Sequence, residues 1–148
     1  GDMGYLTSDN FLFFKGRYKA VIVLNNGENI NPEPWEAICN NSEFVSQIII
    51  AGQDKPYLSA IIVPNQDYIT KWEKTNDSSN LKNDILMDIN NIMGNSKYFK
   101  WSYQIKNITL INEPFSQENG LLTKKFALNR NAIYTKYSEE IEGMYEKQ

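Results

Sequence analysis

The sequence has no histidine and only one cysteine, Cys39. Without histidine the chain cannot form a Ser-His-Asp or Cys-His nucleophile, and the common zinc sites are excluded as well. One cysteine cannot form an internal disulfide, and among apolar neighbours it is usually a small core residue. We therefore expect Cys39 to be buried and the chain to hold no metal.

Long hydrophobic runs and an excess of positive charge are missing too. No apolar stretch approaches the ~20 residues that span a bilayer, and the first residues lack the basic-then-apolar profile of a signal peptide. The net charge of −3 argues against a general nucleic-acid binder, because nothing here would neutralise a long run of phosphates. We expect a cytoplasmic location, with attachment of a longer parent protein to a membrane surface as an open alternative.

The composition that is present is typical of one globular domain. Hydrophobic residues make up 41% of the 148 positions and charged residues 22%, which suffices for a buried core. The chain opens on Gly1-Asp2 without an initiation region, so we expect it to be a piece of that longer parent.

Apolar runs of strand length predict a small sheet built from hairpins. Asn25-Asn26-Gly27 closes the run at residues 21–24, and an Asn-Gly step is a strong turn signal because it accepts positive φ. A second hairpin, residues 45–51 and 57–63, is expected at the centre of the sheet. Further strands are expected at residues 11–15 and 108–111.

Helical spacing of apolar residues predicts the covering layers. Pro32 and Pro34 suit the first turn of a short helix that ends near Asn40. Asn65 or Asp67 can cap the next helix. Residues 76–80 are expected to form a loop, followed by a helix over 81–93 and a last helix over about 129–145. The predicted fold class is α+β, a small sheet covered by helices.

The opening run, GDMGYLTSDNFLFFKGRYKAVIVLNNGENINPEPWE, resembles the segment that joins the two domains of AMP-forming acyl-CoA synthetases, the adenylate-forming superfamily. It is most similar to the long-chain fatty acid–CoA ligases. The resemblance continues through YLSAIIVP, ITLINEPF and the closing LTKKFALNR…KY…IEGMY. It implies that residues 1–18 end the large N-terminal domain and that residues 19–148 are the small C-terminal domain.

The resemblance also implies roles for four residues. Asp2 matches the aspartate that accepts from both ATP ribose hydroxyls, and Arg17 the arginine that approaches the ribose and phosphates. Lys19 falls at the hinge, about which the small domain swings between adenylating and thioester-forming arrangements. Gly27 would face the active site in the second arrangement. From the residues alone, Asp2 would be a turn residue, Arg17 an exposed strand-end residue and Lys19 a solvated charge.

The implied function is fatty acid activation in two steps. ATP, with Mg²⁺ in the parent enzyme, and a fatty acid give acyl-adenylate and pyrophosphate; the thiol of CoA then displaces AMP. We expect the fragment alone to be inactive, because in this family the phosphate-binding loop and the acyl tunnel belong to the large domain. The alternative is a non-catalytic binding or regulatory domain derived from the same family.

The stretch GLLTKKFALNR at residues 120–130 departs from the implied pattern, which is close to G-E-L-T-P-T-x-K-x-K-R. Ala127 occupies the position of the lysine that reaches the α-phosphate, and Lys125 lies two residues earlier. Three interpretations stay open: the lysine is absent, it was replaced deliberately, or Lys125 acts from a shifted loop. Glu28, where long-chain ligases often carry lysine, weakens a role for the Gly27 turn in holding CoA phosphates.

Overall fold

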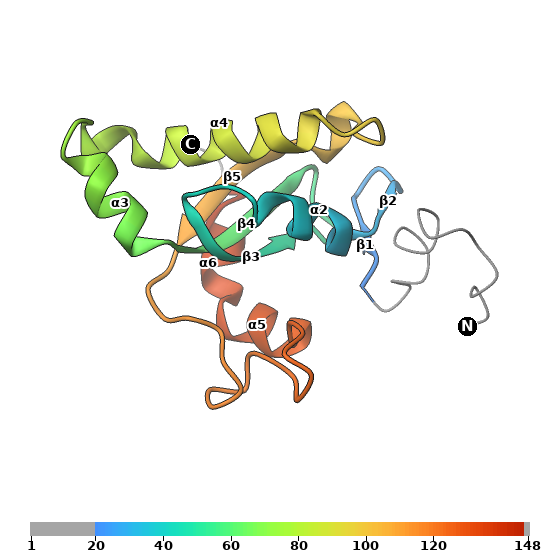
Figure 1. Ribbon diagram of the computed structural model, residues 1–148. Helices are drawn as coiled ribbons and strands as arrows, with labels where there is room; N and C mark the ends of the chain where they lie inside the picture. Colours follow the sequence, from blue (N-terminus) through green and yellow to red (C-terminus); the bar gives the residue numbers. More distant parts are fainter. Residues whose placement is uncertain (1–19, 147–148) are drawn as a thin grey trace.

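The computed structural model describes residues 20–146, and these form an α+β domain as predicted (Figure 1). The predictions for Asp2, Arg17, Lys19 and a strand at 11–15 lie outside the described residues. In chain order the elements are β1 (Ile22–Val23), β2 (Asn29–Ile30), α2 (Pro32–Cys39), β3 (Val45–Ala51), β4 (Leu58–Pro64), α3 (Gln66–Glu73), the 3₁₀ turn η1 (Ser78–Asn80), α4 (Leu81–Gly94), the 3₁₀ turn η2 (Trp101–Tyr103), β5 (Ile105–Leu110), α5 (Arg130–Lys136) and α6 (Ser138–Gly143).

The main sheet has three strands in the order β3-β4-β5. The predicted hairpin is confirmed, with β3 antiparallel to β4 and Ile49 opposite Ile61. Only β4 lies at the centre, because β5 pairs with it in parallel and leaves β3 at an edge. β5 also begins earlier than the predicted residue 108. The side-chain amide of Asn90 on α4 binds both backbone groups of Ile105, at 2.8 and 2.9 Å, and so satisfies the first residue of the strand.

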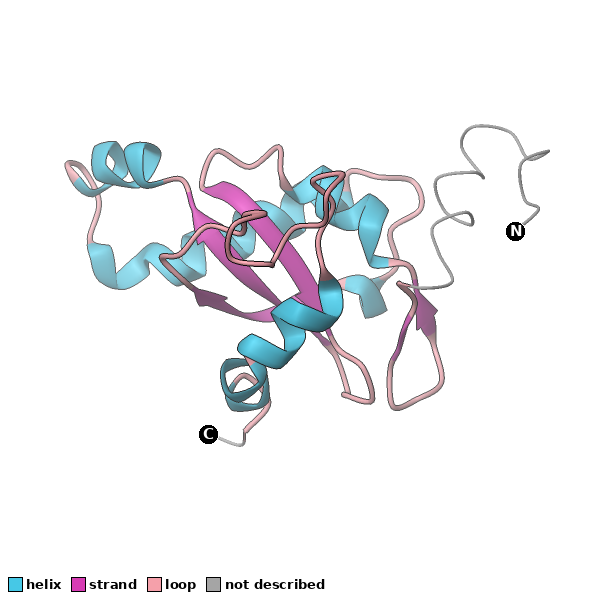
Figure 2. Cartoon of the chain, turned by 90° about the horizontal axis from the view of Figure 1, so that it is seen from below, coloured by secondary structure: helices cyan, strands magenta, loops and turns pink. Residues whose placement is uncertain are grey.

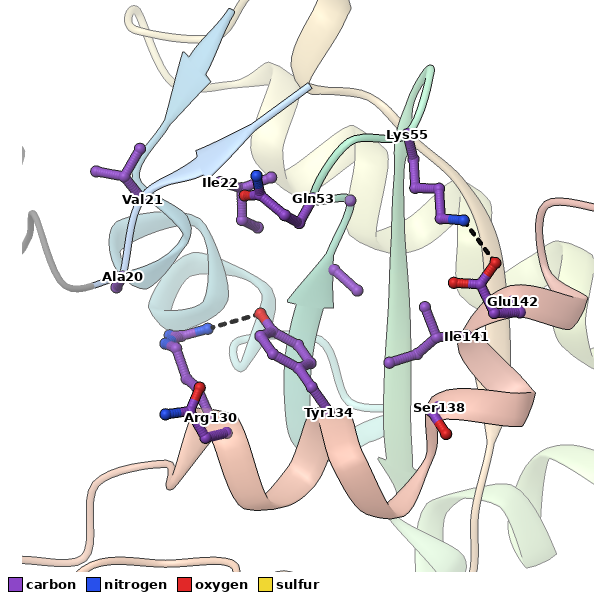
Figure 3. Close-up of a pocket in the computed structure, with 13 residues that line it drawn as sticks. Ala20, Val21, Ile22, Gln53, Lys55, Arg130, Tyr134, Ser138, Ile141 and Glu142 are labelled. Atoms are coloured by element: carbon purple, nitrogen blue, oxygen red, sulfur yellow. Dashed lines mark hydrogen bonds and ion pairs between the residues drawn. The ribbon is translucent and has the colours of Figure 1, made fainter. Parts of the chain in front are cut away.

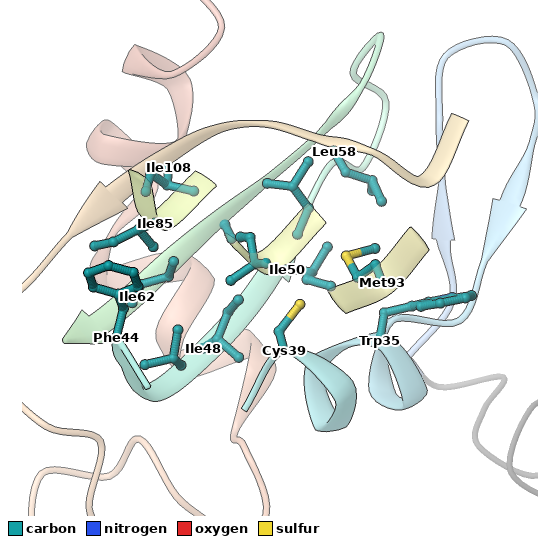
Figure 4. Packing of buried hydrophobic residues seen from close by; sticks show 14 of the residues in the cluster. Trp35, Cys39, Phe44, Ile48, Ile50, Leu58, Ile62, Ile85, Met93 and Ile108 are labelled. Carbon is teal, nitrogen blue, oxygen red and sulfur yellow. The ribbon is translucent and has the colours of Figure 1, made fainter. Parts of the chain in front are cut away.

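Successive side chains of the buried strands point to opposite faces of the sheet and so contribute to two hydrophobic cores, one on each face. Ile48, Ile50 and Ile62 point to the cluster that contains α2 and α4 (Figure 4). Ile49 and Ile61 point to the opposite cluster, which contains α5. The helices therefore cover both faces (Figure 2). Cys39 is fully buried in the first cluster, as predicted, and burial raises the pKa of its thiol to about 12.

Side-chain caps begin the first two helices, which start where the sequence predicts them. Asn31 accepts from the amide of Glu33 at 3.3 Å and so caps α2. Asn65, not Asp67, caps α3, since its side chain accepts from the amide of Tyr68 at 3.3 Å. The predicted loop at 76–80 contains η1, because Asp77 accepts from the amide of Ser79 at 3.0 Å.

The predicted last helix is wrong in one respect, since it breaks at Tyr137 into α5 and α6. Tyr137 has φ −107° and ψ 26°, outside the helical region. The change of direction brings the hydroxyl of Tyr145 to within 2.8 Å of both the Tyr57 carbonyl and the Ser59 hydroxyl. Among residues 20–146, no helix has the length and apolar character needed to cross a membrane.

Candidate functional site

The first hairpin, β1–β2, turns at Gly27 as predicted. Gly27 has φ +90°, and its amide donates to the Leu24 carbonyl at 2.8 Å. The left-handed conformation strains any residue with a Cβ, so glycine is favoured here on backbone grounds. Apart from Gly27 and its two chain neighbours, no heavy atom of the described residues lies within 4 Å of the position that a Cβ would take. The turn therefore presents an open stretch of backbone that a ligand could approach closely.

Hydrogen bonds on two sides fix this hairpin to the rest of the domain. The β3–β4 turn meets it through backbone hydrogen bonds from Asn25 to Lys55 and from Asp54 to Val23, both 2.9 Å. On its other side, the hydroxyl of Ser102 in η2 donates to the Glu28 carboxylate at 2.8 Å. A fixed negative charge thus stands directly beside Gly27, where phosphates would be disfavoured.

The loop at residues 120–130 is closed at its tip by hydrogen bonds centred on Thr123. The amide of Thr123 donates to the Ala127 carbonyl at 2.8 Å, and the Ala127 amide donates to the Thr123 hydroxyl at 3.2 Å. Phe126 completes the turn with φ +65°. Gln117 further supports the tip by donating to the carbonyls of Thr123 and Lys124.

This geometry gives the two candidate positions different surroundings. Lys125 lies at the exposed tip, and its amide donates to the Thr123 hydroxyl at 3.2 Å. Ala127 lies at the base of the tip, where both its backbone groups pair with Thr123. Moving Lys125 by two residues into the place of Ala127 would break these bonds and the β-bridge between Leu122 and Leu128.

A buried ion pair that the sequence analysis missed lies at the end of this loop. Arg130, the first residue of α5, donates from both terminal nitrogens to the carboxylate of Glu36 on α2, with Nη1 to Oε2 at 2.9 Å. The same carboxylate accepts from the amide of Ile50 on β3 at 2.8 Å. The Tyr134 hydroxyl donates to the Ile50 carbonyl at 2.6 Å and lies 3.4 Å from Arg130 Nη1.

Burial and pairing act against each other on these groups. Glu36 is only 5% exposed, and burial raises the pKa of its carboxyl, while the hydrogen bonds and charge of Arg130 and the Ile50 amide oppose that rise. Burial lowers the pKa of the Arg130 guanidinium, but the hydrogen bonds and charge of Glu36 outweigh it and raise that pKa overall. Arg130 therefore stays charged, and the carboxylate depends on it.

Arg130 lines two cavities. One, of about 360 Å³, opens between the start of the described chain at Ala20–Ile22, the β3–β4 turn and α5–α6 (Figure 3). Lys55 and Glu142 form a 2.6 Å ion pair beside it. The other, of about 330 Å³, lies beneath the loop and is lined by Glu36, Phe126 and Ala127 among others. Arg130 therefore lies in the wall between the cavity beside Ala20–Ile22 and the cavity beneath the loop.

Residues 19–148 match the family of AMP-binding enzyme C-terminal domains. The chain belongs to this family. Human long-chain-fatty-acid–CoA ligase 1 is 31% identical over 156 residues, which include 98% of this chain and 22% of the human protein. A chloroplastic long-chain-fatty-acid–[acyl-carrier-protein] ligase of Arabidopsis thaliana is 30% identical over 138 residues, which include 90% of this chain and 18% of the Arabidopsis protein. The AMP-binding C-terminal domain thus spans about a fifth of the length of these relatives.

Solved structures share the fold of this AMP-binding C-terminal domain. The adenylation domain of a carboxylate reductase from Mycobacterium chelonae superposes with a TM-score of 0.78 at 25% identity, covering 86% of this chain and 19% of that one. A didomain of the Segniliparus rugosus carboxylic acid reductase, in complex with AMP, superposes with a TM-score of 0.76 at 25% identity, covering 87% of this chain and 18% of that one. The α+β class and the resemblance to the adenylate-forming superfamily are therefore confirmed.

Of the predicted site residues, the structure describes Gly27 and Lys125, and it does not bring these two together. Gly27 lies on the β1–β2 hairpin and Lys125 on the loop before α5, at separate sides of the domain (Figure 1). The sequence analysis included Arg130 only as the last residue of the stretch 120–130 and overlooked Glu36 and Tyr134. The available signal was a carboxylate at Glu36, flanked by Trp35 and the apolar residues that end α2.

Proposed function

We propose that this domain is the mobile C-terminal part of an AMP-forming long-chain fatty acid ligase. The observation that carries this proposal is the pair of separate faces, an open glycine turn at Gly27 and a closed loop at 120–130, on one packed domain. Two faces suit a domain that presents one of them to the active site in each half-reaction. The long-chain fatty acid ligases among the relatives support the substrate class.

In the proposed chemistry, a carboxylate oxygen of the fatty acid attacks the α-phosphorus of ATP, and pyrophosphate leaves. The sulfur of a thiol then attacks the acyl carbon, and AMP leaves. Mg²⁺ would accompany the ATP. Asp2 and Arg17 would hold the nucleotide, Lys19 would act as the hinge, and Gly27 would border the thiol in the second step. Catalysis here rests on positioning and charge stabilisation, which need no histidine.

We propose that the family's catalytic lysine is absent from this chain. Ala127 carries no amine, and its two hydrogen bonds to Thr123 oppose the shift that would let Lys125 take its place. Losing one donor aimed at transition-state charge costs about 10²–10³ in rate. The adenylating step would therefore be slow, whereas thioester formation would not depend on this loop.

The test is Ala127→Lys in the full-length protein, followed by pyrophosphate release from ATP and fatty acid. We expect adenylation to rise about 10²–10³-fold and thioester formation from supplied acyl-adenylate to stay unchanged. If instead Lys125→Ala abolishes adenylation and Ala127→Lys changes little, Lys125 is the catalytic residue. If neither change alters adenylation, the loop does not reach the α-phosphate and the proposal is wrong.

Ala127 also favours a second candidate, a non-catalytic binding or regulatory domain derived from this family. ATP–pyrophosphate exchange separates the two, because a ligase with a slow first step exchanges above background and a non-catalytic protein does not. The isolated 148-residue chain should release no AMP from ATP, palmitate and CoA in either case, since the rest of the nucleotide site would be missing.

We propose CoA as the thiol acceptor, and the relatives make a carrier protein its rival. The fixed carboxylate of Glu28 stands beside the Gly27 turn, so this turn would border the pantetheine arm and leave the CoA phosphates to other residues. The choice is tested by supplying acyl-adenylate with CoA or with a phosphopantetheinylated carrier protein and comparing the rates of transfer.

We further propose that the parent works in the cytoplasm at a membrane surface. Its support is the indole of Trp101, which is 80% exposed and directly follows Lys100, with Lys97 three residues before that lysine, a combination typical of membrane interfaces. Sedimentation of the full-length protein with anionic and with neutral vesicles tests this. Binding should require anionic lipid and weaken in Trp101→Ala; no binding to either vesicle would exclude it.

A further inference from the structure

The two functional faces are joined inside the domain by the buried pair of Glu36 and Arg130. The β1–β2 hairpin that carries Gly27 leads within a few residues into α2, which carries Glu36. The loop at 120–130 ends at Arg130, which begins α5. The contact between the two side chains therefore spans 94 positions of sequence and links one face to the other.

The contact between Glu36 and Arg130 fixes the relative orientation of the two side chains as well as the distance between them. Arg130 binds both carboxylate oxygens of Glu36, and a bidentate fork allows little rotation of either group. The Ile50 amide holds the carboxylate on β3, and the Tyr134 hydroxyl holds α5 to the carbonyl of the same residue. Both α2 and α5 are thus hydrogen-bonded to the same residue of β3, Ile50.

Stability alone does not require this arrangement. A well-packed apolar pair of similar volume in place of a buried ion pair is often as stable or more so. An apolar pair would still fill the space between α2 and α5, but it would lack the hydrogen-bonded directions that set the start of α5. The feature that only the charged pair supplies is therefore orientation.

We propose that Glu36 and Arg130 are positioning residues that hold the 120–130 loop in a fixed relation to α2 and the Gly27 hairpin. The small domain then swings as one body, and each face arrives at the active site already formed. This inference rests on the proposed function only for the use of the loop in adenylation. The mechanical link itself can be measured without any activity.

The first experiment measures amide hydrogen exchange in the 148-residue chain. The double variant Glu36→Met/Arg130→Met keeps apolar packing and removes the fork, so we expect the amides of Thr123, Phe126 and Ala127 to exchange at least tenfold faster. Amides of β4 should stay as protected as before. Lys136→Gln is the matched control. Lys136 is on the same helix as Arg130, and the change breaks its exposed ion pair with Glu113. Unchanged exchange in the loop of the double variant overturns the proposal.

The second experiment measures the half-reactions in the full-length protein carrying Ala127→Lys. When Glu36→Met/Arg130→Met is combined with Ala127→Lys in one chain, adenylation should fall about 10²-fold, the cost of a misplacement near 1 Å. Thioester formation from supplied acyl-adenylate should be retained. Arg130→Lys keeps the charge and loses the bidentate contact, so its adenylation rate should lie between those of the Ala127→Lys protein and the combined variant. Equal loss in both half-reactions, or full adenylation with the apolar pair, overturns the positioning role. If Ala127→Lys alone gives no adenylation, the proposed function fails, and the exchange result decides the link by itself.

Discussion

Removing Arg130 alone should be among the most destabilising single changes in this domain. Arg130→Met leaves the Glu36 carboxylate, 5% exposed, with the Ile50 amide as its remaining partner in the described structure. Breaking a buried pair from one side costs about 3–5 kcal/mol, a large share of the 5–15 kcal/mol that is typical of a domain. Glu36→Met/Arg130→Met should cost far less, because no buried charge is left behind.

Urea unfolding followed by tryptophan fluorescence measures these differences. The double-mutant cycle isolates the coupling between the two positions, and we expect it to reach at least about 2 kcal/mol, as one-sided loss of a buried pair implies. Lys136→Gln breaks the exposed ion pair between Lys136, on the same helix as Arg130, and Glu113, and it should change stability far less than Arg130→Met does. If the effects at Glu36 and Arg130 are simply additive, the contact contributes nothing specific and the reasoning is refuted.

The pH dependence of Arg130→Met gives an independent check. Burial raises the pKa of the Glu36 carboxyl, and in this variant the opposing charge and hydrogen bonds of Arg130 are gone. An acid whose pKa is higher in the folded than in the unfolded state adds stability below its unfolded pKa, and this is lost as pH rises through the folded pKa. The deficit relative to the unmodified chain should therefore be smaller at pH 4 than at pH 7. Equal deficits at both pH values would show that the carboxylate is not the source.

Three further predictions concern single residues. Burial raises the pKa of Tyr145 to about 12, so stability should fall between pH 10 and 12, and Tyr145→Phe should cost about 1 kcal/mol at pH 7 yet flatten that alkaline loss in urea unfolding. Gly27→Ala should cost about 1–2 kcal/mol through strain at φ +90°, and Gly27→Asn less, in the same assay. Lys19→Pro in the full-length protein should impair one half-reaction far more than the other, because proline removes a soft dihedral at the hinge; equal losses would indicate misfolding.

Local patterns were sufficient to predict most of the elements. The Asn-Gly step at 26–27, the prolines of α2 and the helical spacing of α4 each depend on residues close in sequence, and all three are observed. The parallel pairing of β5 with β4 could not be predicted in this way. It needs a crossover through α3 and α4, and Asn90 on α4 binds the backbone of Ile105 at the start of β5, a contact that no local pattern indicates.

The site was predicted less completely, for the same physical reason. The Gly27 turn carries its own signal, because its backbone conformation favours glycine wherever it occurs. Glu36 carries only the weak signal of its apolar neighbours, since a carboxylate in the first turns of a helix is ordinary on an exposed face. Only the fold shows that this face is buried and that Arg130 meets it from a distant part of the chain.

The contacts that support the 120–130 loop do not depend on the side chain at position 127, where we propose that the family's lysine is missing. The tip of the 120–130 loop is still closed by Thr123, Gln117 and the β-bridge, and its base is still held by Arg130. None of these contacts involves the side chain at position 127. The support of the loop is therefore separable from its chemistry, and a single substitution at Ala127 can remove or restore an amine without disturbing the geometry around it. This separation makes the response of adenylation to Ala127→Lys a direct measure of what the amine contributes.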